Sequence, residues 1–145
     1  MDNIQQNLTK EKMKLDFKDA NYATGKRKTS IAKIWLKKGS GKIFVNGKNY
    51  EDYFKRSNHK MQILRPFEII DQSTTYDVKC SVKGRGHTGQ AGAMVHGISK
   101  ALLLFDSNLK ATLKKEKLTT RDSRAVERKK YGHRKARRSF QFSKR

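Results

Sequence analysis

The chain has 145 residues, enough for one domain of ordinary size and too few for two. Its 35 Lys and Arg residues outnumber 13 Asp and Glu residues and give a formal charge of +22, so a polyanion is the expected partner, either nucleic acid, an anionic membrane surface or an acidic protein. A membrane is disfavoured because no apolar run approaches the ~20 residues that span a bilayer. We also expect no signal or transit peptide. The single cysteine, Cys80, has no partner for an internal disulfide, which fits a reducing compartment.

Three segments differ in composition. Residues 1–20 form a polar N-terminal extension in which acidic and basic side chains balance, and we expect a mobile end without a function of its own. Residues 21–118 carry nearly all of the periodic apolar pattern and are predicted to form a compact α/β domain. Residues 119–145 are predicted to form an extended basic tail that binds RNA.

The first predicted strands follow a basic cluster. Lys26, Arg27 and Lys28 open the domain and are expected to contact phosphate. Alternation over residues 30–38 predicts a strand, and residues 42–45 predict a second one after a Gly-Ser-Gly turn, so the two are expected to pair as a hairpin. Asn46-Gly47 is a strong signal for a tight turn.

The middle of the domain combines a helix and a strand. Residues 57–65 predict a short helix that is capped by Ser57 and stops before Pro66. Residues 76–83 give the clearest strand, with Tyr76, Val78, Cys80 and Val82 on one apolar face. Cys80 is therefore interpreted as a buried small hydrophobe rather than a nucleophile or a metal ligand.

A glycine-rich segment, residues 84–89, matches the G-x-G-x-x-G dinucleotide fingerprint before a helix that runs to about Phe105. The oxidoreductase interpretation fails because no second parallel strand follows. The free N–H groups at this helix start would still attract an RNA phosphate, with help from Arg85, His87 and Thr88. Small residues recur every fourth position along the helix, which favours tight packing on a sheet over contact with RNA.

Residues 107–118 predict a last helix, capped by Ser107, with Leu109 and Leu113 facing inward. No catalytic constellation, metal-ligand spacing or cofactor motif stands out along the chain, because the four histidines are scattered and the acids are few. We therefore expect neither an enzyme nor a bound metal or cofactor.

The tail carries the strongest functional signal. Residues 121–145 hold eleven Lys and Arg against two acids, and aromatic rings are interleaved with the charges. Arginine grips phosphate through two hydrogen bonds, and aromatic rings stack on unpaired bases. The predicted RNA-binding residues of the tail are Arg121, Arg124, Arg128, Lys129, Lys130, Tyr131, Arg134, Lys135, Arg137, Arg138 and Phe140.

Ordered motifs over residues 22–145 resemble a known family, the bacterial-type ninth protein of the small ribosomal subunit. The motifs are residues 23–28 (ATGKRK), 86–93 (GHTGQAGA) with 96–98 (HGI), 118–122 (LTTRD), 127–132 (ERKKYG) and 135–145 (KARRSFQFSKR). The resemblance implies a two-layer α/β sandwich with helices on one face of a mixed four-stranded sheet, similar to the second domain of the fifth small-subunit protein. The first twenty or so residues lie outside it.

The resemblance also implies a location in the ribosome and binding partners. It implies a place in the head of the small subunit, bound to the 3′ major domain of the small-subunit ribosomal RNA and to neighbouring head proteins. It implies that Ser143, Lys144 and Arg145 approach the transfer RNA in the peptidyl site. A bacterial cytoplasm and a mitochondrial matrix both fit, and the alternative function is a free nucleic-acid chaperone or compacting protein.

Overall fold

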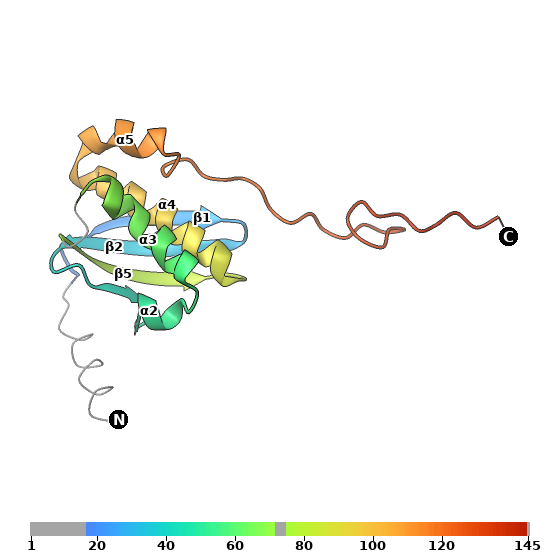
Figure 1. Ribbon diagram of the computed structural model, residues 1–145, viewed down its shortest axis with the longest axis horizontal. Helices are drawn as coiled ribbons and strands as arrows, with labels where there is room; N and C mark the ends of the chain where they lie inside the picture. Colours follow the sequence, from blue (N-terminus) through green and yellow to red (C-terminus); the bar gives the residue numbers. More distant parts are fainter. Residues whose placement is uncertain (1–16, 72–74, 145) are drawn as a thin grey trace, which may run out of the picture.

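The computed structural model describes residues 17–71 and 75–144, and in these ranges four strands are followed by two helices, a fifth strand and the last helical segments (Figure 1). The order is β1 (Asn21–Arg27), β2 (Ser30–Lys38), β3 (Ile43–Val45), β4 (Lys48–Asn49), α2 (Tyr50–Tyr53), α3 (Ser57–Ile69), β5 (Tyr76–Lys83), α4 (His87–Phe105), the 3-10 turn η1 (Ser107–Leu109) and α5 (Lys110–Lys115). Residues 1–16 of the predicted extension, and Arg145, lie outside the described residues.

One mixed sheet carries the domain, with α3 and α4 lying across one of its faces (Figure 1). The strand order is β1-β2-β5-β3-β4, in which β3 and β5 run parallel and the other neighbours run antiparallel. The α/β class and the mixed sheet are as predicted. The sheet has five strands rather than four, because the short β4 adds an edge beside β3.

The alternating patterns of β2 and β5 are confirmed. Ala32, Ile34 and Leu36 of β2 are fully buried, and in β5 Val78 is fully buried while Cys80 keeps 2% of its surface exposed. These side chains point toward the helices, so their alternation marks the face that packs in the core. Burial raises the pKa of the Cys80 thiol far above its ordinary value, which agrees with a purely structural role.

The predicted hairpin between residues 30–38 and 42–45 is wrong. The neighbours of β2 are β1 and β5, and β3 pairs with the far side of β5. The reason is Asp77 at the start of β5, whose Oδ1 accepts hydrogen bonds from the backbone N–H groups of Ser40 and Lys42, each at 2.9 Å. This carboxylate holds the glycine turn beside β5 and directs the chain past it. Asp77, expected on the outer face, is thereby buried.

The Asn46-Gly47 turn joins β3 to β4 as predicted. Both residues have positive φ, 48° and 81°, which the tight hairpin turn requires. The Asn46 side chain also accepts a hydrogen bond from the Val82 N–H at 2.8 Å and donates one to the Val82 carbonyl at 3.0 Å. The turn is therefore tied to the end of β5.

Helix α3 runs through Pro66 to Ile69, so the predicted stop before the proline is wrong. A proline inside a helix costs roughly 3 kcal/mol because it removes a backbone hydrogen bond. Here Ile63, Pro66 and Phe67 are all buried, and core burial of about 1.5–3 kcal/mol for each large side chain offsets that cost. The predicted cap is also wrong, since Ser57 is the first helical residue and Arg56 precedes it without a side-chain cap.

Helix α4 packs against β1 almost without side chains between the two backbones. A methyl group at Gly25 of β1 would collide with the carbonyl oxygen of Ala93 and the backbone of Gly97 in α4. A methyl group at Gly97 would lie 2.7 Å from Cγ1 of Ile34. The small residues of this helix therefore serve packing, which is the interpretation favoured from the sequence.

The last helical segment is shorter than predicted and is capped by another residue. η1 and α5 together cover residues 107–115 instead of the predicted 107–118, and the Asp106 carboxylate, not Ser107, accepts the capping hydrogen bond from the Asn108 N–H. Leu113 is fully buried and Leu109 is partly buried against the core, as predicted. This segment places the start of the tail above α4 (Figure 1).

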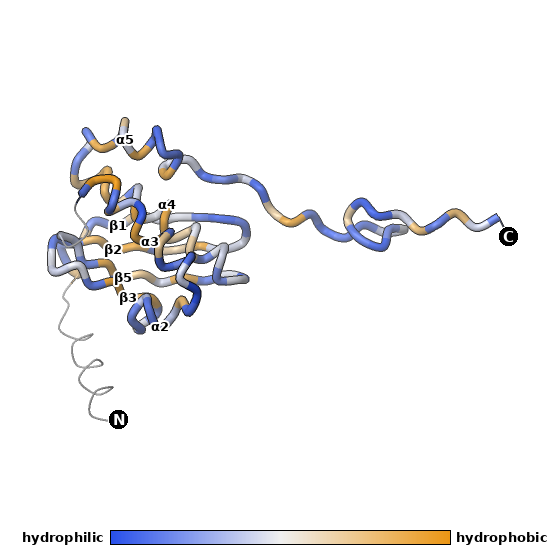
Figure 2. Tube along the Cα trace, in the orientation of Figure 1, coloured by the Kyte–Doolittle hydropathy of each residue, from blue (hydrophilic) through white to orange (hydrophobic). Residues whose placement is uncertain are grey.

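The first residues after Leu118 stay beside the domain, and the chain then runs away from it (Figures 1 and 2). Through residue 144 it forms no helix or strand except an isolated bridge between His133 and Ser139. Its hydrophilic residues dominate the trace in Figure 2. Within the described part of the chain, no helix is long and apolar enough to cross a membrane.

Candidate nucleic-acid interface

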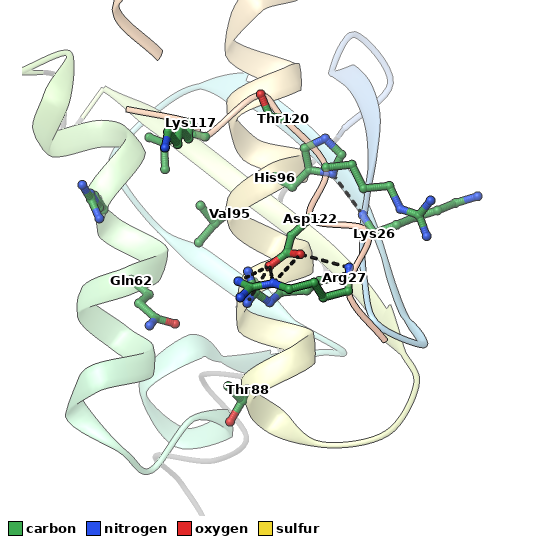
Figure 3. A pocket seen from close by; sticks show the side chains of 14 residues that line it. Lys26, Arg27, Gln62, Thr88, Val95, His96, Lys117, Thr120 and Asp122 are labelled. Carbon is green, nitrogen blue, oxygen red and sulfur yellow. Dashed lines mark hydrogen bonds and ion pairs between the residues drawn. The ribbon is translucent and has the colours of Figure 1, made fainter. Parts of the chain in front are cut away.

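A groove of about 440 Å3 opens where β1, α3, α4 and the first residues of the tail meet (Figure 3). Its walls bring together cations that are far apart in the sequence, with Asp122 as the acidic member of the lining. These cations are Lys26, Arg27, Arg65, Lys117, Arg121 and Arg124. Crowding like charges at one concave surface is favourable only when an anion neutralises them.

Asp122 ties the start of the tail to the domain. Its carboxylate accepts three hydrogen bonds from the Arg124 side chain and one from the Arg124 backbone N–H, and its Oδ2 lies 3.1 Å from Nη2 of Arg27 in β1. The Arg124 guanidinium holds the pKa of the Asp122 carboxyl well below its usual range, with Arg27 adding to the effect. The tail thus leaves the domain from a fixed origin, and these two arginines share a carboxylate.

His96 makes a second link at the same place. Its Nδ1 accepts a hydrogen bond of 3.2 Å from the backbone N–H of Lys26, on the outer edge of the sheet, and the ring also hydrogen-bonds the Thr119 backbone. Burial lowers the pKa of His96, and the nearby charges of Lys100 and Arg121 lower it further. The imidazole is therefore neutral at pH 7, as an acceptor nitrogen requires.

The glycine-rich segment places its predicted residues at different positions. Helix α4 begins at His87 after two glycines of positive φ, Gly84 and Gly86. Thr88 lines the groove, and its hydroxyl lies 3.2 Å from Nε2 of His59. His87 faces a neighbouring hollow with Tyr53 and Lys55, while the exposed Arg85 lines neither cavity.

The groove therefore unites five of the predicted RNA-binding residues. These are Lys26, Arg27, Thr88, Arg121 and Arg124. Lys28 lies in an adjoining hollow of about 330 Å3 that shares Arg27, Asp122 and Arg124 with the groove but is a separate opening. Lys28 has a positive φ of 51° at the β1–β2 turn, which holds its backbone at the rim.

The rest of the predicted tail residues lie along the exposed chain. Tyr131 and Phe142 keep 94% and 87% of their surfaces exposed. Guanidinium groups lie over two of the rings, Arg128 at 5.7 Å from the centre of Tyr131 and Arg134 at 5.3 Å from that of Phe140. Such pairs present flat, cationic faces on which bases stack. Arg137 is bound by the Glu127 carboxylate through two hydrogen bonds.

Sequence reasoning missed Arg65, Lys117 and His96 as members of the groove. Arg65 comes from the middle of α3 and is held by Glu116 at 2.8 Å, and Lys117 has a positive φ of 57° just after α5. No local pattern marks these residues, because only the packing of α3 and α5 beside α4 brings them together. Among the described residues, no cluster of three His, Cys, Asp or Glu side chains could hold a metal ion.

The groove and the tail together suit a long, flexible polyphosphate better than a small ligand. The groove is open and cationic, and the tail continues it with alternating arginines and rings. Comparison with known proteins agrees with this chemistry. A family described as ribosomal protein S9/S16 matches residues 25–145, which include the groove cations and the whole tail.

Proposed function

Because the chain belongs to the ribosomal protein S9 family, a family of structural rather than catalytic small-subunit proteins, we propose that it binds small-subunit ribosomal RNA through the groove and the tail. The observation that carries the proposal is the continuity of the two cationic surfaces. Asp122 and His96 fix the tail at the rim of the groove, so one RNA segment could follow the groove onto the tail. The RNA proposed is the 3′ major domain in the head of the subunit, with head proteins as neighbours.

The groove cations divide into two groups by their partners. Arg27 and Arg124 share Asp122, and Arg65 is paired with Glu116. Lys26, Lys117 and Arg121 have no ion-pair partner among the described residues. These three are the cations from which phosphate contacts gain most, because no protein carboxylate competes there.

A salt titration tests the groove. Each phosphate contact contributes about 0.7–0.9 to the slope of log affinity against log salt. For an RNA fragment of the 3′ major domain, the double variant Lys117→Gln/Arg121→Gln should flatten the slope by roughly 1.5. The matched control is Lys110→Gln/Lys114→Gln, which removes two exposed α5 lysines outside the groove. Equal slopes for both double variants would contradict the proposed site.

The end of the tail is proposed to hold transfer RNA in the peptidyl site. Ser143 and Lys144 are exposed at the far end of the described tail, and Arg145 follows them. Removing these three residues should leave subunit assembly intact and speed dissociation of peptidyl-site transfer RNA. Dissociation at the unchanged rate from subunits that carry the shortened chain would refute this part.

The cellular compartment is a further part of the proposal. We propose a small subunit in a bacterial cytoplasm or a mitochondrial matrix. A free nucleic-acid chaperone would have the same positive charge but would need no fixed position in the ribosome. Sedimentation of a cell extract separates the two functions, since the ribosomal one requires the protein in the small-subunit peak.

A further inference from the structure

The face of the sheet opposite α3 and α4 carries a row of rings. Tyr22 of β1 pairs with Trp35 of β2, Trp35 with Lys79 of β5, and Lys79 with Phe44 of β3. Residues in register on adjacent strands share a face, so the four side chains cross the sheet side by side. The rings of Tyr22 and Trp35 are 5.4 Å apart, and Tyr22 keeps 46% of its surface exposed.

This row is open to a ligand. A hollow of about 150 Å3 lies between Trp35, Phe44 and Lys79, with Phe17 at its side. Nζ of Lys79 is 5.8 Å from the centre of the Phe17 ring. Flat rings with a cation between them match a nucleotide, because the bases stack on the rings and the amine meets the phosphate.

The charge of this face also selects for an anion. Lys33, Lys79 and Lys83 are exposed on the strands that flank the row. Asp77 is the one acidic residue of β1, β2, β3 and β5. It is only 6% exposed, and its carboxylate already accepts hydrogen bonds from backbone N–H groups. The chain's own residues 1–16 complement this face poorly, since their three acids balance three lysines.

We propose that this open sheet face, the row Tyr22–Trp35–Lys79–Phe44, is a second RNA site that takes unpaired nucleotides by base stacking. It extends the proposed RNA-binding function to a surface behind the groove and shares its premise that RNA is the partner. An acidic protein would meet the same lysines without needing an aromatic row, so RNA is the occupant that uses every feature.

Trp35 is the single tryptophan of the chain, so its fluorescence reports this face alone in the full-length protein. A short, unstructured oligouridylate should quench it, because stacked bases quench indole emission. Polyphosphate and polyglutamate, which carry charge without bases, should bind without quenching. Lys79→Gln and Tyr22→Ala should each weaken the quenching transition about tenfold. Lys115→Gln, an exposed α5 lysine, serves as the matched control and should leave it unchanged.

A second readout separates this site from the groove and tail. Anisotropy of a labelled oligouridylate measures total RNA binding by the same protein. Anisotropy that rises while Trp35 stays unquenched overturns the second site and leaves the proposed function standing. Equal quenching by polyphosphate or by polyglutamate also overturns it, since charge or an acidic protein would then explain the response. No rise in anisotropy refutes the proposed function itself.

Discussion

The contact between α4 and β1 makes a sharp prediction about two glycines of one helix. Gly97→Ala and Gly92→Ala are the same substitution on α4, and each should gain about 1 kcal/mol from helix propensity. Their surroundings differ. A methyl group at Gly97 would lie 2.7 Å from Cγ1 of the fully buried Ile34 and 3.0 Å from the backbone nitrogen of Gly25. A methyl group at Gly92 would meet the flexible side chain of Arg27.

The balance of these effects sets opposite signs. Overpacking a core costs about 1–3 kcal/mol, and at Gly97 the neighbours are strand backbone and a rigid side chain that have no room to move. Because these neighbours cannot move, we expect a cost in the upper part of that range, about 2–3 kcal/mol, so that Gly97→Ala lowers the free energy of unfolding by about 1–2 kcal/mol after the propensity gain of about 1 kcal/mol. Gly92→Ala should be neutral or stabilising by up to about 1 kcal/mol, because Arg27 can swing away.

Urea unfolding followed by circular dichroism measures both variants. The midpoint should shift down for Gly97→Ala with an unchanged slope, as expected when stability alone changes. Gly92→Ala should leave the urea midpoint unchanged or raise it. It should also move Arg27 away from Asp122, which weakens the ion pair between β1 and the start of the tail. A Gly97→Ala protein as stable as the unsubstituted chain would refute the close packing of α4 on β1.

Three further outcomes are expected. Burial lowers the pKa of His96, so below the ordinary histidine pKa of about 6.5 the unfolded chain takes up a proton that the folded chain does not. The free energy of urea unfolding should therefore be constant above about pH 7 and decrease as the pH drops below it. For His96→Asn this decrease should be less steep. The buried Cys80 thiol, whose pKa is raised, should react with an alkylating reagent only at the rate of unfolding, and fast alkylation of the native protein would contradict its burial. Asp77→Ala should lower the free energy of thermal unfolding by about 1–3 kcal/mol because it leaves the N–H groups of Ser40 and Lys42 without an acceptor.

Sequence periodicity predicted the parts of the fold that depend on a residue's neighbours in the chain. The alternation of β5 and the apolar stripe of α4 are local patterns, and both elements form where expected. The Asn46-Gly47 turn is local as well. The family motifs over residues 22–145 agree with the match over residues 25–145.

What failed depends on contacts between distant residues. The pairing of β3 with β5 rests on the Asp77 carboxylate, which lies more than thirty residues after the loop it binds. The passage of α3 through Pro66 depends on the core that receives Phe67. In the groove, Lys26 and Arg121 were identified because they lie in charged runs. Arg65 and Lys117 were missed because tertiary packing alone places them there.

The two acids of the tail have a consequence for how binding energy is released. Asp122 and Glu127 already neutralise Arg124 and Arg137, so a phosphate that takes over either arginine displaces a protein carboxylate instead of freeing a mobile salt ion. Counterion release drives most of the affinity of basic segments for nucleic acid. The affinity of the tail for RNA should therefore depend on salt less steeply than its eleven cations suggest. These internal ion pairs should in this way reduce non-specific binding to nucleic acid.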